Sequence, residues 1–312
     1  MSRTSPTSLG HEHALARRDE PSPAQRRWPL RMPIPWSLWP AMIFFLLYLV
    51  APLAVVFYYS LQPNPLAGSS AAGLSFGNYR YFLTQSYYVN ALARTLRFAA
   101  LTTAASVAVG YGAALVLRHV SERVGSLAAL VLTFPILSGP IVTVMGWMIT
   151  FTSGGVVGQS LAAIRALFGL PEASTRLLGT DLAVMVGMVH FNLAFVILNL
   201  LSVLLQIPPS LEEAAMNLGA NPWRTFWHVI WPMSLPGLFS AALISFALSM
   251  NAFVTPMYLG NPSRPVMTTL ISQFMLTSYN WQMASATSVL LLWLSLLVIF
   301  VSNWLYSRSL KL

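Results

Sequence analysis

The sequence predicts an all-α integral membrane protein with six transmembrane helices. Its 312 residues are 56% hydrophobic and only 8% charged, whereas about a quarter of the residues of a soluble domain are charged. The hydrophobic residues are also gathered into long runs, and a bilayer core about 30 Å thick requires about 20 mostly apolar helical residues to cross it. Composition and clustering together therefore exclude a soluble fold.

Six apolar runs mark the expected spans. They cover residues 36–60, 95–117, 126–151, 182–205, 235–259 and 285–306. Pro52 and Pro256 lie inside the first and fifth runs. Neighbouring helices can satisfy the backbone groups that a proline frees, so we expect kinks at these positions and not breaks.

The basic residues indicate how the spans are oriented. The formal net charge is +9, but six of the seventeen basic residues precede Trp36 and the others are scattered singly, so the charge indicates membrane topology and not nucleic-acid binding. Arginine and lysine are enriched in cytoplasmic segments close to the spans. The amino terminus is therefore expected inside and, with six spans, the carboxyl terminus as well. Arg94 and Arg97, at the expected outer start of the second span, oppose this assignment.

A short interfacial helix is expected outside the third and fourth spans, within residues 152–180. Leu161, Ile164 and Leu167 fall at helical spacing there, and Gly169 is a suitable end. We expect this helix to pack as a lid on the outer ends of the spans, with a contact to the cargo as the alternative.

The loop at residues 207–232, between the fourth and fifth spans, carries the most informative pattern. Ser210 and Glu213 have the spacing of a capping box, in which each side chain binds a backbone donor at the start of one helix. A helix is therefore expected to begin at Leu211.

The same loop contains signals for the end of that helix and the start of another. Gly219 can adopt the left-handed conformation that ends a helix. Asn221 can cap the next helix, and Pro222 suits its first turn, where no backbone donor is needed. The pattern predicts two short helices bent at a glycine. Their apolar faces consist of Leu211, Ala214, Ala215 and Leu218 in the first helix and of Trp223, Phe226, Trp227 and Ile230 in the second.

This loop resembles the EAA loop of binding-protein-dependent ABC importer permeases. The matching residues are Glu213, Ala214 and Ala215, then Gly219 after three residues, and Val229 and Pro232 further on. Val229 and Trp231 stand where the family more often has Ile and Leu. The resemblance extends over most of the chain, and Phe76–Tyr79, Ala252–Pro256 and Asn280–Trp281 look most like the spermidine/putrescine-type branch.

The resemblance implies a type I ABC importer permease bundle, MetI-like, in the bacterial inner membrane. The loop would be the helix that couples the permease to its ATPase, with Glu213, Ala214, Ala215 and Gly219 at signature positions and Asn221 and Pro222 beside them. The implied partners are a cytoplasmic ABC ATPase dimer, a second homologous permease subunit, a periplasmic solute-binding protein and the lipid bilayer, with no nucleic acid.

Four parts of the chain follow from these expectations. Residues 1–35 have little apolar periodicity and are expected to form a disordered cytoplasmic tail. Residues 36–60 form the first transmembrane helix, 61–92 a periplasmic segment, and 93–307 the permease transmembrane domain, with the coupling loop at 207–232.

The chain carries no sign of its own catalytic chemistry. Its only lysine is Lys311 and it contains no GxxxxGK[ST] sequence, so it lacks the phosphate-binding loop that an ATPase requires. It also has no cysteine and no His, Asp and Glu set at metal-ligand spacing. We therefore expect a transport subunit with no cofactor, no metal and no catalytic residue.

Polar residues inside the spans are candidates for the transport path. Asn192 and Asn251, with Phe253 and Thr255 nearby, are expected either to line that path or to join helices through hydrogen bonds. His190 is expected to be a packing residue.

The cargo is expected to be a polyamine-like amino compound, because the resemblance points there. The spans contain no carboxylate, and in the external loops only Glu172 and Asp181 oppose the basic residues, so a zwitterionic or anionic solute is the alternative. An ion-coupled secondary transporter is a distant alternative, because it would need ionisable groups within the membrane.

Overall fold

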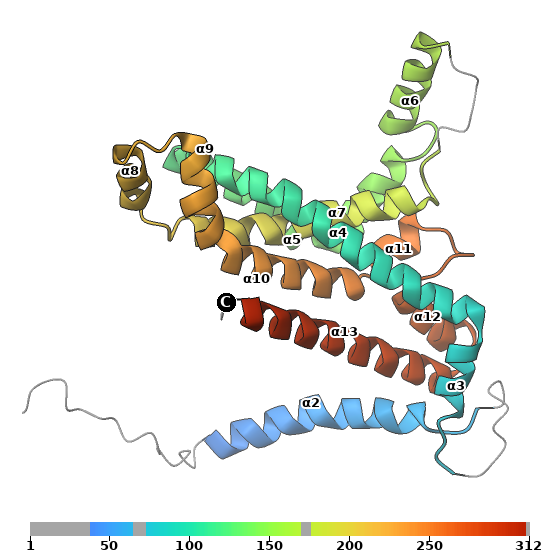
Figure 1. The fold of residues 1–312 in the computed structure, drawn as a ribbon. Coiled ribbons are helices and arrows are strands. Elements are labelled where there is room, and N and C mark those ends of the chain that lie inside the picture. Colours follow the sequence, from blue (N-terminus) through green and yellow to red (C-terminus); the bar gives the residue numbers. More distant parts are fainter. Residues whose placement is uncertain (1–37, 65–72, 170–175, 310–312) are drawn as a thin grey trace, which may run out of the picture. The chain divides into compact units, whose positions relative to one another are not determined.

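The computed structural model describes residues 38–64, 73–169 and 176–309, and all regular elements in these ranges are helical (Figure 1). The expected tail at 1–35 lies outside the described residues. Six of the described helices are long and apolar enough to cross a membrane, as the sequence predicts. They are α2 (Trp39–Ser60), α4 (Ser86–Arg118), α5 (Glu122–Thr150), α7 (Asp181–Leu204), α10 (Trp231–Met250) and α13 (Trp281–Ser309).

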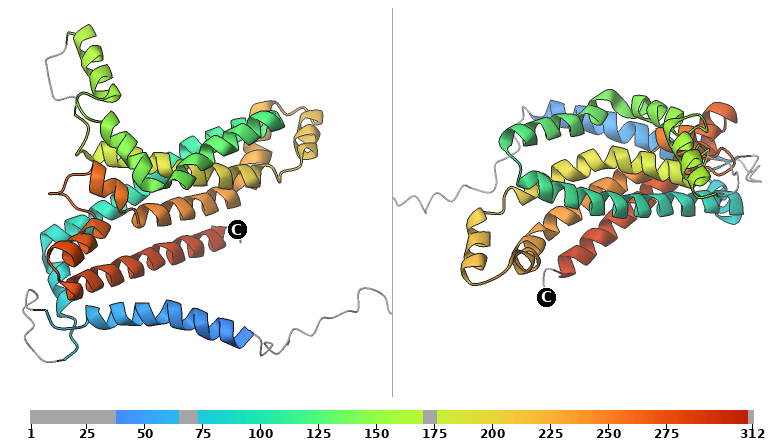
Figure 2. Two further views of the ribbon diagram at one scale, coloured as in Figure 1. Left: turned by 180° about the vertical axis from the view of Figure 1, so that it is seen from behind. Right: turned by 90° about the horizontal axis from the view of Figure 1, so that it is seen from above.

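Shorter helices connect the spans. They are α3 (Gly77–Thr84), α6 (Val156–Leu167), α8 (Pro209–Asn217), α9 (Pro222–Thr225), α11 (Val254–Leu259) and α12 (Met267–Ser272), together with the π-helices η4 (Phe226–Ile230) and η5 (Gln273–Thr277). The chain consists of two units. Within the second unit, α8 and α9 lie at the carboxyl-terminal ends of α4 and α7, and α11 and α12 lie at the opposite end (Figures 1 and 2).

The chain divides at Leu53 into two units, and each is described by itself. The first contains the beginning of α2, in which every described residue up to Leu53 is exposed. These side chains are apolar on all sides of the helix, which is suited to contact with lipid. The helix continues through Pro52.

Three helices, α4, α7 and α10, form the centre of the second unit. A buried cluster joins them on the side of α8 and α9, and it includes Tyr111, Val196, Leu200, Leu204 and Ala241. Glycine allows the helices to approach closely, because a Cβ atom at Gly110 of α4 would lie 2.6 Å from Val196 Cγ1 of α7. Small residues are enriched at such contacts because little hydrophobic force drives helices together in lipid.

The prediction of the fifth span was wrong at the carboxyl-terminal end of the span. The sequence predicts a helix to residue 259, but α10 ends at Met250 and a separate helix, α11, begins at Val254. The carbonyl of Ala252, between the two helices, accepts a hydrogen bond of 2.7 Å from the Thr268 hydroxyl. Hydropathy does not detect this interruption because both helices are apolar.

The second span begins earlier than expected. The helix α4 starts at Ser86 and not at 95, so the expected periplasmic segment 61–92 contains α3 and the first turns of α4. Tyr88, in these turns, stacks on Phe82 of α3 with ring centroids 5.4 Å apart. Aromatic packing thus extends the helix beyond its hydrophobic run.

The third span contains a break that the sequence analysis did not predict. Gly139 has φ 77° and ψ 161°, which interrupts the helical conformation of α5 immediately before Pro140. This conformation is almost restricted to glycine. The two halves of α5 therefore have different directions within the span.

The expected external helix is present, but its expected packing is wrong. The helix α6 spans Val156–Leu167, and Gly169 follows it with φ 61°. Gly158 is the only buried residue in α6, and Ile164 and Leu167 are exposed. The described residues therefore show no lid packed on the ends of the spans.

We predict that Gly110→Ala destabilises the fold by about 1–3 kcal/mol, because the added methyl group overpacks the contact between α4 and α7. Gly112→Ala, on the same helix, is the control, because a Cβ atom there meets nothing within 4 Å. Thermal unfolding of both variants in detergent measures the difference. Equal stabilities would contradict the role of Gly110 in helix packing.

Candidate functional site

The helix α8 begins the loop between α7 and α10. It starts at Pro209, after Pro208, and no side chain caps it. The predicted capping box of Ser210 and Glu213 was therefore wrong. Proline is favoured at the first helical position because its missing N–H is not needed there, and this places Ser210 inside the first turn and not at the cap.

The predicted helix end at Gly219 is present. Gly219 has φ 85°, and its N–H donates to the Met216 carbonyl at 2.9 Å. The N–H of Ala220 donates to the Ala215 carbonyl at 3.0 Å. These two bonds form a Schellman motif, which closes a helix through a residue in the left-handed conformation. Gly219 thus fixes the angle at which the chain leaves α8.

The second half of the loop is only partly as predicted. The Asn221 side chain caps α9 by accepting from the Arg224 N–H at 2.8 Å, and Pro222 occupies the first turn. The expected short second helix is not separate, however. It continues through η4, in which the N–H of Trp231 donates to the Phe226 carbonyl, directly into α10.

The aromatic residues of this second half do not share one environment. Phe226 and Trp231 pack on Tyr111 of α4, with ring centroids 6.3 and 5.5 Å from it. Trp223 and Trp227 are exposed, whereas Ile230 is buried. The face predicted from helical spacing is therefore divided between the core and the surface.

The surface of α8 is open. Glu213, Ala214 and the apolar side chains of Leu211 and Met216 are exposed, and Leu218 is 89% exposed. An exposed apolar patch beside a carboxylate is typical of a surface that another protein covers.

Sequence analysis missed one interaction of this loop. The Glu212 carboxylate forms an ion pair of 2.5 Å with the Arg118 guanidinium at the end of α4. The only signal in the sequence was a charged residue in the first turn of one expected helix and another at the end of a distant span. Such a signal does not specify a pair.

The four residues expected to line a transport path lie around one cavity of about 440 Å³ beside the end of α10. Asn192, Asn251, Phe253 and Thr255 all contribute to its wall, as does Pro140 at the break in α5. The cavity is largely apolar and its described lining contains no charged side chain.

The two asparagines of this cavity are held differently. Asn192 is 2% exposed, and its Nδ2 donates to Ser245 Oγ at 3.0 Å and Ser249 Oγ at 2.7 Å. It therefore joins α7 to α10, as one of the two expectations stated. Asn251 is exposed, and its Nδ2 donates within its own helix, to the Ala247 carbonyl at 2.9 Å.

His190 lies apart from this cavity. Its ring meets Trp147 of α5 edge to face, with centroids 5.6 Å apart. The contact is a packing contact, but His190 also lines a separate cavity of about 920 Å³ beside α5.

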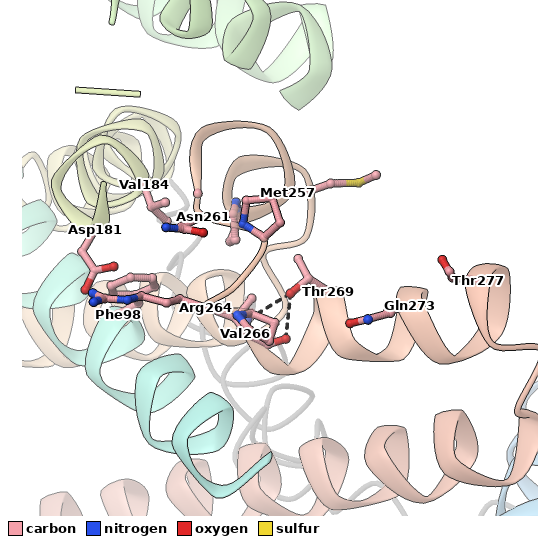
Figure 3. A pocket seen from close by; sticks show the side chains of 14 residues that line it. Phe98, Asp181, Val184, Met257, Asn261, Arg264, Val266, Thr269, Gln273 and Thr277 are labelled. Atoms are coloured by element: carbon pink, nitrogen blue, oxygen red, sulfur yellow. Dashed lines mark hydrogen bonds between the residues drawn. The ribbon is translucent and has the colours of Figure 1, made fainter. Parts of the chain in front are cut away.

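A second cavity, of about 360 Å³, lies at the other end of the unit and was not predicted (Figure 3). Its polar side chains come from α7, from the loop after α11 and from α12 and η5. Asp181 forms an ion pair with Arg97, and Arg94 donates to the Pro265 carbonyl at 3.3 Å. Both arginines that oppose the expected topology are thus bound to neighbouring elements at this end.

The profile of a family described as "Binding-protein-dependent transport system inner membrane component" matches residues 33–311. The chain belongs to this family. It is therefore a multi-pass inner-membrane permease of an ABC importer, a transport subunit and not an enzyme, and such permeases work with an ATPase and a binding protein.

Curated relatives include permeases named for polyamine transport. The spermidine/putrescine transport system permease protein PotB of Haemophilus influenzae is 28% identical over 228 residues, which cover 72% of this chain and 78% of the relative. PotB of Escherichia coli is 26% identical over 238 residues, covering 75% and 85%.

Solved ABC importers show the same fold. A chain of a bacterial alginate transporter, in complex with an alginate-bound periplasmic protein, has a TM-score of 0.71 at 18% identity and covers 87% of this permease and 93% of that chain. A chain of the MetNI methionine transporter in an inward-facing conformation has a TM-score of 0.55 at 21% identity, covering 71% and 95%. The expected MetI-like fold is confirmed.

We predict that Asn221→Ala loosens the start of α9 by about 1 kcal/mol, the usual value of a side-chain cap. Asn221→Asp retains the cap acceptor and is the matched control. Hydrogen exchange of a peptide covering residues 221–230 should be faster in the alanine variant of this permease alone. Equal exchange in both variants would show that the cap contributes nothing.

Proposed function

We propose that this permease imports a polyamine-like amino compound, and that α8 is the element through which an ATPase drives it. The exposed helix α8, ended by Gly219 and carrying Glu213, is the observation that supports the coupling role. Similarity to two PotB proteins supports the cargo class.

The coupling role is favoured by what α8 presents. Its apolar side chains and Glu213 are exposed, and the Schellman turn at Gly219 fixes its end. An ATPase that closes on ATP would move two such helices, one from this chain and one from a second homologous permease. Rigid bundles would then rock between inward-open and outward-open arrangements.

The transport path is proposed to pass the cavity around Asn192 and Asn251. This cavity adjoins two interruptions of helix, at Gly139 and after Met250. Irregular backbone at membrane depth is tolerated where it is enclosed in protein or lines a cavity. The amide of Asn251 and the ring of Phe253 would offer a passing amine a polar contact and an aromatic face without trapping it.

A zwitterionic or anionic cargo is the second candidate. The second cavity, shown in Figure 3, is lined by Arg264. Its one described carboxylate, Asp181, is paired with Arg97. The described lining there does not favour a multiply charged cation.

The proposed topology places both termini in the cytoplasm together with α8. Arg94 and Arg97, whose charges oppose this topology, are held by local contacts at the end opposite α8. Arginines held in this way are a weak guide to orientation, so they carry little weight against the proposal.

We predict that Glu213→Ala combined with Gly219→Pro abolishes ATP-dependent uptake and co-purification of the ATPase, since it removes the exposed carboxylate and the left-handed turn. Uptake of labelled putrescine by vesicles containing the complete transporter measures this. The control is the level of the variant in the membrane. Uptake that persists without the ATPase would instead indicate an ion-driven carrier.

We predict that Asn251→Leu lowers uptake several-fold, because it removes a polar group from the wall of the cavity. ATPase association should be retained, because the Asn251 side chain bonds only to the last turn of its own helix. Asn303→Leu, an exposed asparagine of α13, is the control. Labelled spermidine, a zwitterionic amino acid and a dicarboxylate should be compared. Transport of the dicarboxylate alone would refute a polyamine cargo, and unchanged uptake in Asn251→Leu would exclude this residue from the path.

A further inference from the structure

We propose that Arg118 is a positioning residue that fastens α8 to α4, so that movement of α8 is passed to the centre of the membrane bundle. The proposal rests on the proposed function of α8 as the contact with the ATPase. It assigns a role to two charged residues, Arg118 and Glu212, outside the signature positions of the loop.

The geometry links two parts of the loop to one side chain. Arg118 Nη2 forms the 2.5 Å ion pair with Glu212 Oε1 and also donates to the Ile207 carbonyl at 3.1 Å. The first contact holds the first turn of α8, and the second holds the chain between α7 and α8. Arg118 therefore holds the entry to α8 at two points.

Burial distinguishes this ion pair from the other described one. The side chains of Arg118 and Glu212 are 7% and 19% exposed, whereas those of Arg97 and Asp181 are 55% and 37% exposed. Exposed pairs are weak because water and salt screen them. Removing one partner of a buried pair is costly because a charge is left without compensation.

The local helix ends also favour both charges. Arg118 lies in the last turn of α4, where the helix dipole favours a positive charge, and Glu212 lies in the first turn of α8, where it favours a negative one. The pair thus joins two helix ends of opposite partial charge.

Phe226 and Trp231 already pack on Tyr111 of α4, but α8 itself has few contacts with the bundle. The chain itself joins the loop to α7 and α10, and α8 packs mainly on α9 and η4. Among the described residues, the Arg118–Glu212 ion pair is the one that joins α8 to α4. It links α8 directly to the third central helix.

The helix α4 is suited to carry such a movement. It contains no proline and runs unbroken to Arg118, and Thr95, about 35 Å away at 1.5 Å per residue, accepts a hydrogen bond of 2.9 Å from the N–H of Met267 in α12. A displacement of Arg118 would therefore reach the outer end of the unit, where Arg97 contacts Asp181.

The contact also leaves α8 free to turn. A bidentate arginine–carboxylate pair fixes orientation as well as position, but here one nitrogen, Nη2, makes both contacts. Nη1 is buried without a hydrogen-bond partner among the described residues. Of the two contacts, only the one with Glu212 lies on the helix itself, so α8 can pivot about it when a partner moves.

The test is Glu212→Gln in the complete transporter, which retains size and removes the charge. We expect the ATPase to stay bound, because the exposed face of α8 is unchanged. The ratio of putrescine taken up to ATP hydrolysed should fall at least about tenfold, because breaking a largely buried pair is costly. Arg123→Gln, which removes an exposed arginine near the same end of the unit, is the control and should change this ratio less than about twofold, as expected of a surface substitution.

Two further variants separate positioning from a general loss of structure. The exchange Arg118→Glu with Glu212→Arg should restore much of the ratio. If it does not assemble, Arg118→Lys, which keeps the charge without the planar fork, should give an intermediate ratio. Because the chain contains no cysteine, a spin label on Asn217→Cys in the purified permease reports on α8 alone, and its mobility should rise in Glu212→Gln.

Normal coupling in Glu212→Gln would overturn the proposal, and so would lost coupling with an unchanged label. Either result leaves the proposed function standing if Glu213→Ala with Gly219→Pro still loses uptake and ATPase. If that double variant remains active, the proposed function itself fails.

Discussion

The close packing of α4 against α7 and α10 is the constraint on which the rest of the second unit depends. A methyl group at Gly110 would meet Val196, and one at Gly237 of α10 would lie 2.8 Å from Val203 Cγ1 of α7. Asn192 then ties α7 to α10 through two serine hydroxyls. The loop with α8 connects α7 to α10, and the cavity lies beside the end of α10, so both are positioned by this packing.

The sequence was sufficient for those features that depend on composition or on local backbone chemistry. Six hydrophobic runs gave the spans, and Gly219, Asn221 and Pro222 gave the turn and the start of α9, because each acts within a few residues of itself. Features that depend on distant partners were missed. The Arg118–Glu212 pair joins residues 94 positions apart, and the local sequence around either residue does not indicate its partner.

The errors within the spans have a common cause. Hydropathy is averaged over a window, so it cannot separate α10 from α11 or reveal the break at Gly139, where all flanking residues remain apolar or small. The capping box failed for a different reason, because two prolines started α8 earlier than the Ser210 signal indicated. The grouping of Asn192, Asn251, Phe253 and Thr255 was proposed from polarity alone, and the structure gathers them around one cavity, while their part in transport remains a proposal.

The π-helical turn η4 has a consequence for how such a protein can change over time. Its hydrogen bond from Trp231 to Phe226 spans five residues and not four, so this turn contains more chain than an α-helical turn. Loss of one residue there would rotate everything on its amino-terminal side by about 100° relative to α10, at 3.6 residues per turn. A length change within these five residues would therefore re-aim α8, and it would also require repacking where Phe226 meets Tyr111 of α4 and where Ile230 is buried.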